Sequence, residues 1–299
     1  MLEGFLLVLI TGFCWIGIGI VVSKCSARGL NFNIVQGVNF SGAVLICAMV
    51  LAGTGAWSAP SEIFGWRFLV SMLAGFTNFY TFVLASKAMK LGPNGLVWGI
   101  MQSGMIGSFL MGVIFFGEKP SLLRLVGLAL ILSGVMVMGL AKDGKFSGKG
   151  KSWVLYSFGA FLLVMATHCC NAMPSFFPVA AKISSFTRAL GLFSGGLLGF
   201  SITTLPGMIR NRNFGSKREW FSGWIFMALN ISASALFFYR GLDRLAQFGC
   251  GGLGYPIAIG ICVAGFSLYS LLILKEKFSR LILSGLAAVC LGIVIIAIR

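Results

Sequence analysis

The seventeen residues Glu118–Gly134, EKPSLLRLVGLALILSG, return later in the chain as Glu276–Gly292, EKFSRLILSGLAAVCLG. At this offset of 158 residues, nine of the seventeen positions hold the same amino acid. The identical positions include the Glu-Lys pair that opens each copy and two glycines seven residues apart. Since the offset is about half of the 299 residues, the chain reads as two copies of one unit. Duplication in a hydrophobic chain is typical of membrane transporters built from two pseudosymmetric halves.

The composition indicates a membrane protein. Hydrophobic residues make up 58% of the chain and charged residues 10%, against about 25% charged residues in soluble domains. A helix needs roughly 20 consecutive apolar residues to cross the hydrocarbon core of a bilayer. Runs of this kind occupy about 4–22, 34–52, 66–86, 93–115, 121–140, 153–173, 183–205, 220–239, 247–273 and 279–298. We therefore expect an all-α integral membrane protein with ten transmembrane helices.

The repeat predicts how these helices are organised. The offset of 158 residues maps the first run onto the sixth and the fifth onto the tenth. Each copy therefore holds five helices, and an odd number places the second copy in the membrane with the opposite orientation. We expect two inverted five-helix repeats, residues 1–141 and 153–299, joined by a basic Gly/Ser linker at 142–152. The apolar start of the chain has no basic region and no cleavage site, so we interpret it as the first span.

The net charge of +16 results from 23 basic and 7 acidic residues. The basic residues fall in short loops between the predicted spans, as membrane topology requires, so we do not expect nucleic acid as a partner. Fifteen of the 23 lie in loops after the odd-numbered spans, and eight lie on the other side. The positive-inside rule then places the first set in the cytoplasm and both termini outside.

The sequence points to no metal, cofactor or catalytic group. Seven of the eight cysteines lie inside predicted spans without CxxC spacing, as small packing residues do. His168, Cys169 and Cys170 are adjacent on one helix and point in different directions, so they cannot chelate one ion. The chain has no GxxxxGK[ST] motif for ATP. With one histidine and no acid near the middle of a span, we do not expect an enzyme.

Uncharged polar and aromatic side chains inside the predicted spans are the candidates for a substrate site. Trp98 and Gln102 share one helix face because they are four residues apart, and His168 and Asn171 share another. The candidate substrate-binding residues are Trp15, Asn78, Trp98, Gln102, His168, Asn171, Asn230 and Tyr255. Rings beside amides in a cavity with few charges suit a neutral or zwitterionic polar molecule. The alternative for each amide is a structural hydrogen bond to a neighbouring helix.

His168 is the only histidine in the chain. It is either neutral and hydrogen-bonded within the protein, or it contacts substrate or carries a proton. The seven acidic residues all lie at or near span ends. Exporters that exchange protons for organic cations usually place a carboxylate near the middle of the membrane, because a charge is costly there and marks the pathway.

Four runs are dominated by glycine and aliphatic residues, and we expect them to lack such polar groups and to act as packing surfaces. These runs are 34–52, 121–140, 183–205 and 279–298. Small residues at helical spacing let backbones approach closely. Elsewhere, GPNGLVWG at 92–99 and GCGGLGYP at 249–256 open the fourth and ninth runs at equivalent places. Breaks at matching positions of two repeats indicate a binding region, or else a simple packing kink.

The fourth and fifth runs read LGPNGLVWGIMQSGMIGSFLMGVIFFGEKPSLLRLVGLALILSGVMVM (91–138), and 255–298 holds a degenerate copy. This pattern, with ten spans in two halves, resembles the EamA-type drug/metabolite transporter superfamily. The resemblance implies a central cavity lined by helices 1, 3, 4, 6, 8 and 9, which carry the candidate residues. It also implies cytoplasmic termini, opposite to the charge count. It leaves open whether the substrate is an amino acid, sugar, nucleotide sugar, base or drug.

Taken with the resemblance, these patterns predict a secondary transporter that moves a small polar, neutral or zwitterionic metabolite by alternating access. Amino acids, sugars and nucleobase-like compounds belong to this class. The alternatives are an exporter of drugs or toxic organic compounds, an intramembrane enzyme, or a channel. We expect a multi-pass protein of the inner cell membrane that functions as a monomer. Its expected partners are the lipid bilayer and a small-molecule substrate, with no cofactor.

Overall fold

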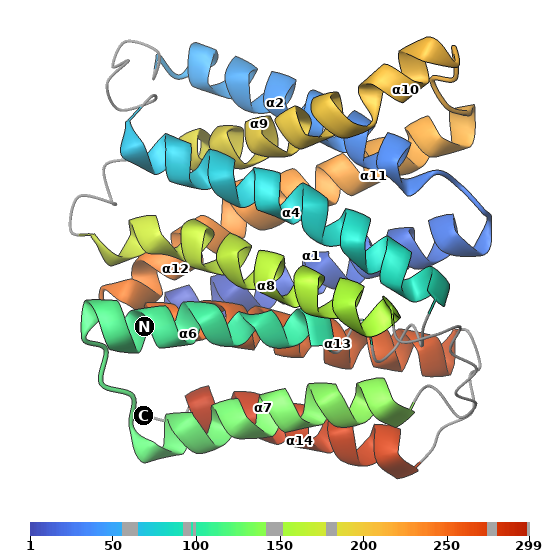
Figure 1. The fold of residues 1–299 in the computed structure, drawn as a ribbon. Helices are drawn as coiled ribbons and strands as arrows, with labels where there is room; N and C mark the ends of the chain where they lie inside the picture. Colours follow the sequence, from blue (N-terminus) through green and yellow to red (C-terminus); the bar gives the residue numbers. More distant parts are fainter. Residues whose placement is uncertain are drawn as a thin grey trace.

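The computed structural model describes residues 1–55, 65–91, 97, 100–141, 152–177, 184–273 and 280–297. All regular structure in these residues is helical. The helices lie side by side and run back and forth across the molecule along a common direction (Figure 1). Each of the ten apolar runs predicted from the sequence coincides with helical residues.

The helices of the first half follow the predicted runs closely. They are α1 (Leu2–Ala27), α2 (Phe32–Gly53), α4 (Trp66–Leu91), α6 (Ile106–Phe116) and α7 (Leu122–Ala141). A short 3-10 segment, η2 (Ser103–Met105), leads into α6. The chain leaves α6 at Gly117, whose φ of 66° is left-handed. Glycine ends the helix here because it adopts this conformation without a steric penalty.

In its described residues, the second half contains five long helices with five shorter segments between them. It comprises α8 (Ser152–Ala172), η3 (Met173–Phe176), α9 (Ser185–Thr203), α10 (Leu205–Arg210), α11 (Lys217–Ile231), η5 (Ser232–Phe238), α12 (Tyr239–Ala246), η6 (Gly251–Leu253), α13 (Gly254–Leu272) and α14 (Arg280–Ala297). The predicted linker 142–152 lies outside the described residues, except for Ser152 at the start of α8. In the opening segment 249–256, the residues before Gly254 are not α-helical and include the 3-10 turn η6, and α13 begins at Gly254.

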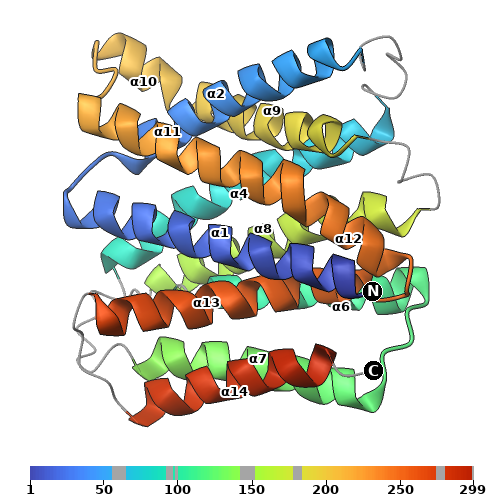
Figure 2. The same ribbon diagram turned by 180° about the vertical axis from the view of Figure 1, so that it is seen from behind.

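The predicted eighth helix, 220–239, is longer than expected. The helices α11 and α12 follow one another as one rod along α1 (Figure 2), and the π-helical segment η5 joins them. A capping box of Ser216 and Glu219 fixes the start of α11. In a π-helix each backbone hydrogen bond spans one residue more than in an α-helix, and such segments occur often at functional sites.

Several of these helices are suited to a bilayer. Among the described residues, five helices are long and apolar enough to cross a membrane: Leu2–Val22, Phe32–Gly53, Trp66–Ala88, Ser152–Phe176 and Lys217–Ala246. Shorter apolar helices cover Ile100–Phe116, Leu122–Val137, Gly251–Phe266 and Leu283–Ile296. This architecture is that of an all-helical membrane protein.

Each half of the chain packs against the other in a regular way. The helix α1 contacts α13, and its counterpart α8 contacts α6. Likewise α4 contacts α9, and α11 contacts α2. The pairs α2 with α9 and α7 with α14 join counterparts directly. The neighbours of each helix are therefore reproduced when the two halves are exchanged.

The close approach of α7 and α14 confirms the packing role predicted for their glycines. A Cβ atom added to Gly134 would lie 2.6 Å from the carbonyl oxygen of Gly285. A Cβ added to Gly292 would lie 2.5 Å from the carbonyl oxygen of Gly127. Both distances are too short for a side chain, so only glycine permits this helix contact.

The start of α1 and the end of α14 lie at the same end of the helix bundle, which we call the termini end (Figure 1). The end of α8, the start of α9 and the end of α12 also reach it. An exposed ion pair of Glu3 with Arg244, 3.2 Å long, ties α1 to α12 there. This end carries the polar network described below.

Candidate functional site

Four aromatic rings from four different elements meet in the interior. Trp15 comes from α1, His168 from α8, Phe238 from η5 and Tyr255 from α13. Tyr255 lies at the centre, because its ring centroid is 3.9 Å from that of His168, 4.6 Å from that of Phe238 and 6.0 Å from that of Trp15. The ring planes of Tyr255 and His168 differ by 23° and those of Tyr255 and Trp15 by 27°, so these rings stack. We call these four residues the ring cluster.

Three of the four residues of the ring cluster are buried, and Trp15 is half-buried. The exposed fraction is 2% for Tyr255 and 6% for His168. The Nδ1 atom of His168 is also buried and has no hydrogen-bond partner within the described part of the chain. An unpaired acceptor or donor in an interior is unfavourable. His168 therefore offers one nitrogen for a group that the described residues do not supply.

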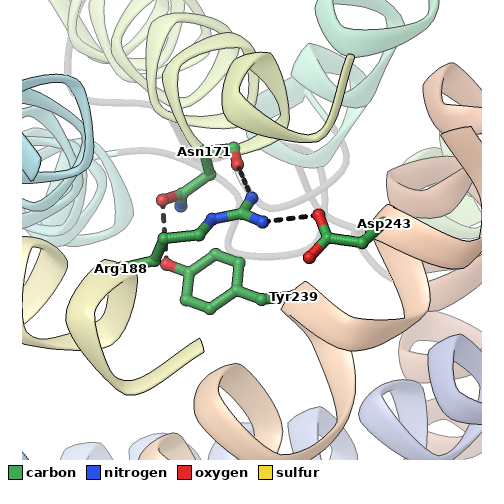
Figure 3. A network of polar contacts seen from close by, with 4 residues as sticks. All are labelled: Asn171, Arg188, Tyr239 and Asp243. Carbon is green, nitrogen blue, oxygen red and sulfur yellow. Dashed lines mark hydrogen bonds and ion pairs between the residues drawn. The ribbon is translucent and has the colours of Figure 1, made fainter. Parts of the chain in front are cut away.

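A second set of polar residues forms a network of hydrogen bonds in the second half of the chain (Figure 3). Arg188, in the first turn of α9, is 1% exposed. Its Nη1 donates to Oδ1 of Asp243 at 2.7 Å, and its Nη2 donates to the carbonyl oxygen of Asn171 at 2.7 Å. Its guanidinium carbon lies 4.2 Å from the centre of the Tyr239 ring. Tyr239 in turn donates its hydroxyl hydrogen to Oδ1 of Asn171 at 3.0 Å.

This Arg188 network, consisting of Asn171, Arg188, Tyr239 and Asp243, is continuous with the ring cluster. Tyr239 follows Phe238 directly, with 6.2 Å between the two ring centroids. Asn171 lies three residues after His168, so both side chains lie on one face of α8. The sites predicted at His168 and Asn171 therefore belong to one region that extends from the interior toward the termini end.

The remaining predicted residues are not members of the ring cluster or of the Arg188 network. Gln102 is buried and precedes η2, and Asn78 is half-buried on α4. Asn230, at the end of α11, donates from Nδ2 to Oδ1 of Asn39 on α2 at 3.3 Å. Trp98 lies outside the described residues, so the predicted shared helix face of Trp98 and Gln102 stays a prediction.

The expectation that the run 34–52 lacks polar groups is wrong. Gln36 and Asn39 of α2 are both buried, at 1% and 0% exposed. Both residues lie in the first turns of a helix whose later residues are aliphatic, so the run as a whole has an apolar composition. The hydrogen bond of Asn39 with Asn230 joins two helices, as the structural alternative for each amide predicts.

Sequence reasoning missed Arg188 and Asp243, which it had assigned to loops and span ends. A signal existed. Arg188 falls five residues inside the predicted run 183–205, in a chain with few charges. An ionisable residue within a span is by default a candidate for function. Its partner could not be identified from sequence, because Asp243 is 55 residues away and only helix packing brings the two together.

A surface pocket of about 360 Å³ lies between the loop after α6 and the end of α12. It is lined by Phe116, Gly117, Glu118, Lys119, Arg124, Phe176, Ala246, Phe248 and Gly249. Glu118, the first residue of the repeat, accepts the backbone N–H groups of Gly251 at 2.6 Å and Gly252 at 3.1 Å. Burial raises the pKa of the Glu118 carboxyl, and these two hydrogen bonds oppose the rise. The carboxylate thus joins the loop after α6 to the segment η6.

Comparison with known proteins identifies the family. Residues 2–140 match the EamA-like transporter family. The chain is 31% identical over 120 residues, 40% of its length, to "Uncharacterized transporter in cobO 3'region" of a Sinorhizobium species, of which the match covers 85%. It is also 31% identical over 74 residues, 24% of its length, to a "Guanidinium exporter" of Yersinia pestis, of which the match covers 68%.

A protein of known crystal structure has the same fold. It shares 16% sequence identity with a TM-score of 0.71, and the match covers 98% of this chain and 95% of that one. The described relatives are transporters, in line with the expectation that this chain is not an enzyme. Together with its apolar helices, these matches show that the chain is a multi-pass membrane transporter that belongs to the EamA family of the drug/metabolite transporter superfamily.

Proposed function

We propose that this chain is a secondary transporter that moves a small polar, neutral or zwitterionic metabolite by alternating access. The observation that carries the proposal is the ring cluster. Three residues selected from the sequence alone, Trp15, His168 and Tyr255, come together from three helices and from both halves of the chain. Rings beside one unpaired polar atom are suited to a ligand that stacks and forms few directed hydrogen bonds.

We further propose that the ten helices form two inverted repeats that rock against one another. Each helix and its counterpart in the other half contact equivalent helices, and this regularity supports the arrangement. The ring cluster lies where the halves meet, because Trp15 belongs to the first and the other three rings to the second. Midplane sites between inverted repeats are the general arrangement in carriers of this kind.

The distribution of charge supports a neutral or zwitterionic substrate. Among the described residues, the buried and half-buried acids already have partners: Asp243 binds Arg188, and Glu219 accepts the backbone N–H of Asn31 and Ser216. Glu118 is likewise held by backbone N–H groups. None of these carboxylates lies within the ring cluster, so the cluster offers a cation no fixed counter-charge.

The second candidate is export of a small organic cation. It is favoured by the relatives described as guanidinium exporters. A planar cation can bind over the faces of Trp15 and Tyr255 through cation–π contact alone, by about 0.5–2 kcal/mol for each ring. Placement in the inner cell membrane and function as a monomer are further parts of the proposal.

Counterflow in proteoliposomes tests both candidates. Purified protein is reconstituted, the vesicles are loaded with a mixture of amino acids, sugars, nucleobases and guanidinium compounds, and exchange is followed by mass spectrometry. We expect saturable exchange of an uncharged or zwitterionic compound. Exchange of guanidinium compounds alone would favour the second candidate. A leak that does not saturate would contradict a carrier altogether.

A further inference from the structure

We propose that Arg188 recognises a carboxylate on the transported molecule, and that Asp243 occupies the place of this carboxylate while the termini end is closed. The inference rests on the proposed transport function and extends it to a substrate class, small zwitterions with a free carboxylate. Asp243 is then the counter-ion of Arg188 in the absence of substrate. When the substrate carboxylate replaces that of Asp243, binding is coupled to opening of the termini end.

The first observation is that the bonding of Arg188 is incomplete. Arg188 joins Asp243 through one nitrogen and one oxygen, although guanidinium and carboxylate groups readily form two parallel hydrogen bonds. The Nε atom of Arg188 is buried and has no hydrogen-bond partner in the described part of the chain. A buried donor without an acceptor calls for an explanation. A carboxylate that accepts hydrogen bonds from both Nε and a terminal nitrogen of Arg188 would give this donor its acceptor.

The second observation is that the network is not part of the duplicated scaffold. Counted from the capping residues of the counterpart helices, Asn31 of α2 and Ser184 of α9, the position of Arg188 corresponds to Val35 in the first half. Val35 is fully buried there in an apolar cluster with Cys25 and Phe226. The same fold is therefore built with apolar residues at this place. A buried ion pair is seldom better for stability than such packing, so its presence in one half alone points to function.

The third observation is that Asp243 is placed to move. It lies on α12 directly after the π-helical segment η5, where the regular hydrogen-bond pattern changes. Its side chain is 19% exposed, while that of Arg188 is 1% exposed. The carboxylate of Asp243 is thus partly accessible at the protein surface, whereas the guanidinium of Arg188 is enclosed. A tilt of α12 about η5 would withdraw Asp243 and leave Arg188 in place.

The position of η5 links this movement to the interior. Phe238, the last residue of η5, contacts both Trp15 and Tyr255 in the ring cluster. A ligand that separates these rings therefore acts on the segment that carries Asp243. Once Asp243 leaves, Arg188 is a buried charge without a counter-ion, which is strongly unfavourable. Only a substrate that brings its own carboxylate removes this penalty, so uncharged analogues should fail to open this end.

Chemical rescue tests whether the site accepts a free carboxylate, without knowledge of the substrate. Asp243→Ala removes the resting carboxylate, and thermal unfolding of the purified variant is measured in sodium acetate and in acetamide with sodium chloride at equal ionic strength. We expect acetate to raise the unfolding temperature of the variant by roughly 2–4 °C, in a saturable manner. Acetamide should have no such effect, and wild type should not respond to acetate.

Two further variants serve as controls. Glu3→Ala breaks the exposed ion pair with Arg244, which lies next to Asp243 on α12. Acetate should not stabilise this variant. The double variant Arg188→Gln/Asp243→Ala should lose the response, because the cation that binds acetate is gone. If Asp243→Ala does not fold, Asp243→Ser takes its place, and folded yield with and without acetate becomes the readout. Equal effects of acetate and acetamide, a response that persists in the double variant, or no folded protein even in acetate would overturn the proposal.

A transport measurement tests the substrate class itself. In counterflow with wild-type protein, each exchanged compound is compared with its primary amide, which keeps the shape and loses the charge of the carboxylate. We expect at least a tenfold preference for the acid. Equal exchange of acid and amide would contradict the role of Arg188. If nothing is exchanged, the transport function fails instead, and the acetate experiment still decides whether Arg188 accepts a carboxylate.

Discussion

His168 and Tyr255 stack face to face, with ring centroids 3.9 Å apart and planes inclined by 23°. The two residues are 87 positions apart in sequence and belong to α8 and α13. The stack buries the histidine and leaves its Nδ1 atom without a partner among the described residues. A ring that is held firmly while one nitrogen stays free is well placed to receive a hydrogen bond from a ligand.

His168→Phe separates these two properties. Phenylalanine keeps the stack on Tyr255 but has no ring nitrogen. We expect the unfolding temperature to remain within a few degrees of wild type and transport affinity to fall by about 1–1.5 kcal/mol, roughly tenfold, for one lost hydrogen bond. Concentration dependence of counterflow measures this loss. Unchanged affinity would show that His168 only packs.

Asn230 was predicted as a substrate contact, and its hydrogen bond with Asn39 indicates a structural role. Asn230→Leu leaves the buried amide of Asn39 without this partner, so we expect a loss of about 1–3 kcal/mol in stability. The double variant Asn39→Leu/Asn230→Leu should recover part of the loss, because no buried amide then remains unpaired. Chemical denaturation measures both. Lower transport affinity with normal stability would restore the substrate role.

The contact of α7 with α14 depends on Gly134. Gly134→Leu would place a side chain against the backbone of Gly285 and force the helices apart, so we expect a large loss of folded protein in detergent. Gly53→Leu is the matched control, since a Cβ atom there meets nothing within 4 Å. Size-exclusion profiles of the two variants give the comparison. Equal yields would mean that the two helices do not pack through these glycines.

Glu118 joins the loop after α6 to η6 by accepting two backbone hydrogen bonds. Glu118→Ala leaves the N–H groups of Gly251 and Gly252 without their acceptor, at about 1–3 kcal/mol for each group that stays buried. We expect a lower unfolding temperature. The exposed Glu3→Ala, which breaks only a surface ion pair, should change it little. A loss of the same size in both variants would argue against this role of Glu118.

Much of the fold could be predicted from sequence because its causes are local or repeated. Helix length and hydropathy locate all ten helical runs, and the repeated glycines predict the contact of α7 with α14. The sequence predicts that Trp15 and Tyr255 both face a common interior, because polar and aromatic groups gather on the same helices. Their stacking on one another depends on how the helices are rotated, and a single sequence does not determine that.

The rest of the site depends on contacts between distant parts of the chain. Arg188 and Asp243 are 55 residues apart, and Asn39 and Asn230 are 191 apart. In a hydropathy profile, each of these polar residues only lowers the value of its own segment and gives no information about its partner. The π-helical segment η5 is likewise invisible, because its composition does not differ from that of an α-helix. These features follow from packing and not from local pattern.

Counterflow in proteoliposomes of wild type and Tyr255→Leu, with the compound identified by the exchange screen, tests the central claim most directly. Tyr255 is the residue on which the ring cluster is centred. If the ring cluster is the substrate site of a carrier, wild type should show saturable uptake that is stimulated by the same compound inside the vesicles. Tyr255→Leu should remain folded and lose at least tenfold in affinity. Uptake that rises linearly with concentration, or equal affinity in the two proteins, would contradict the account.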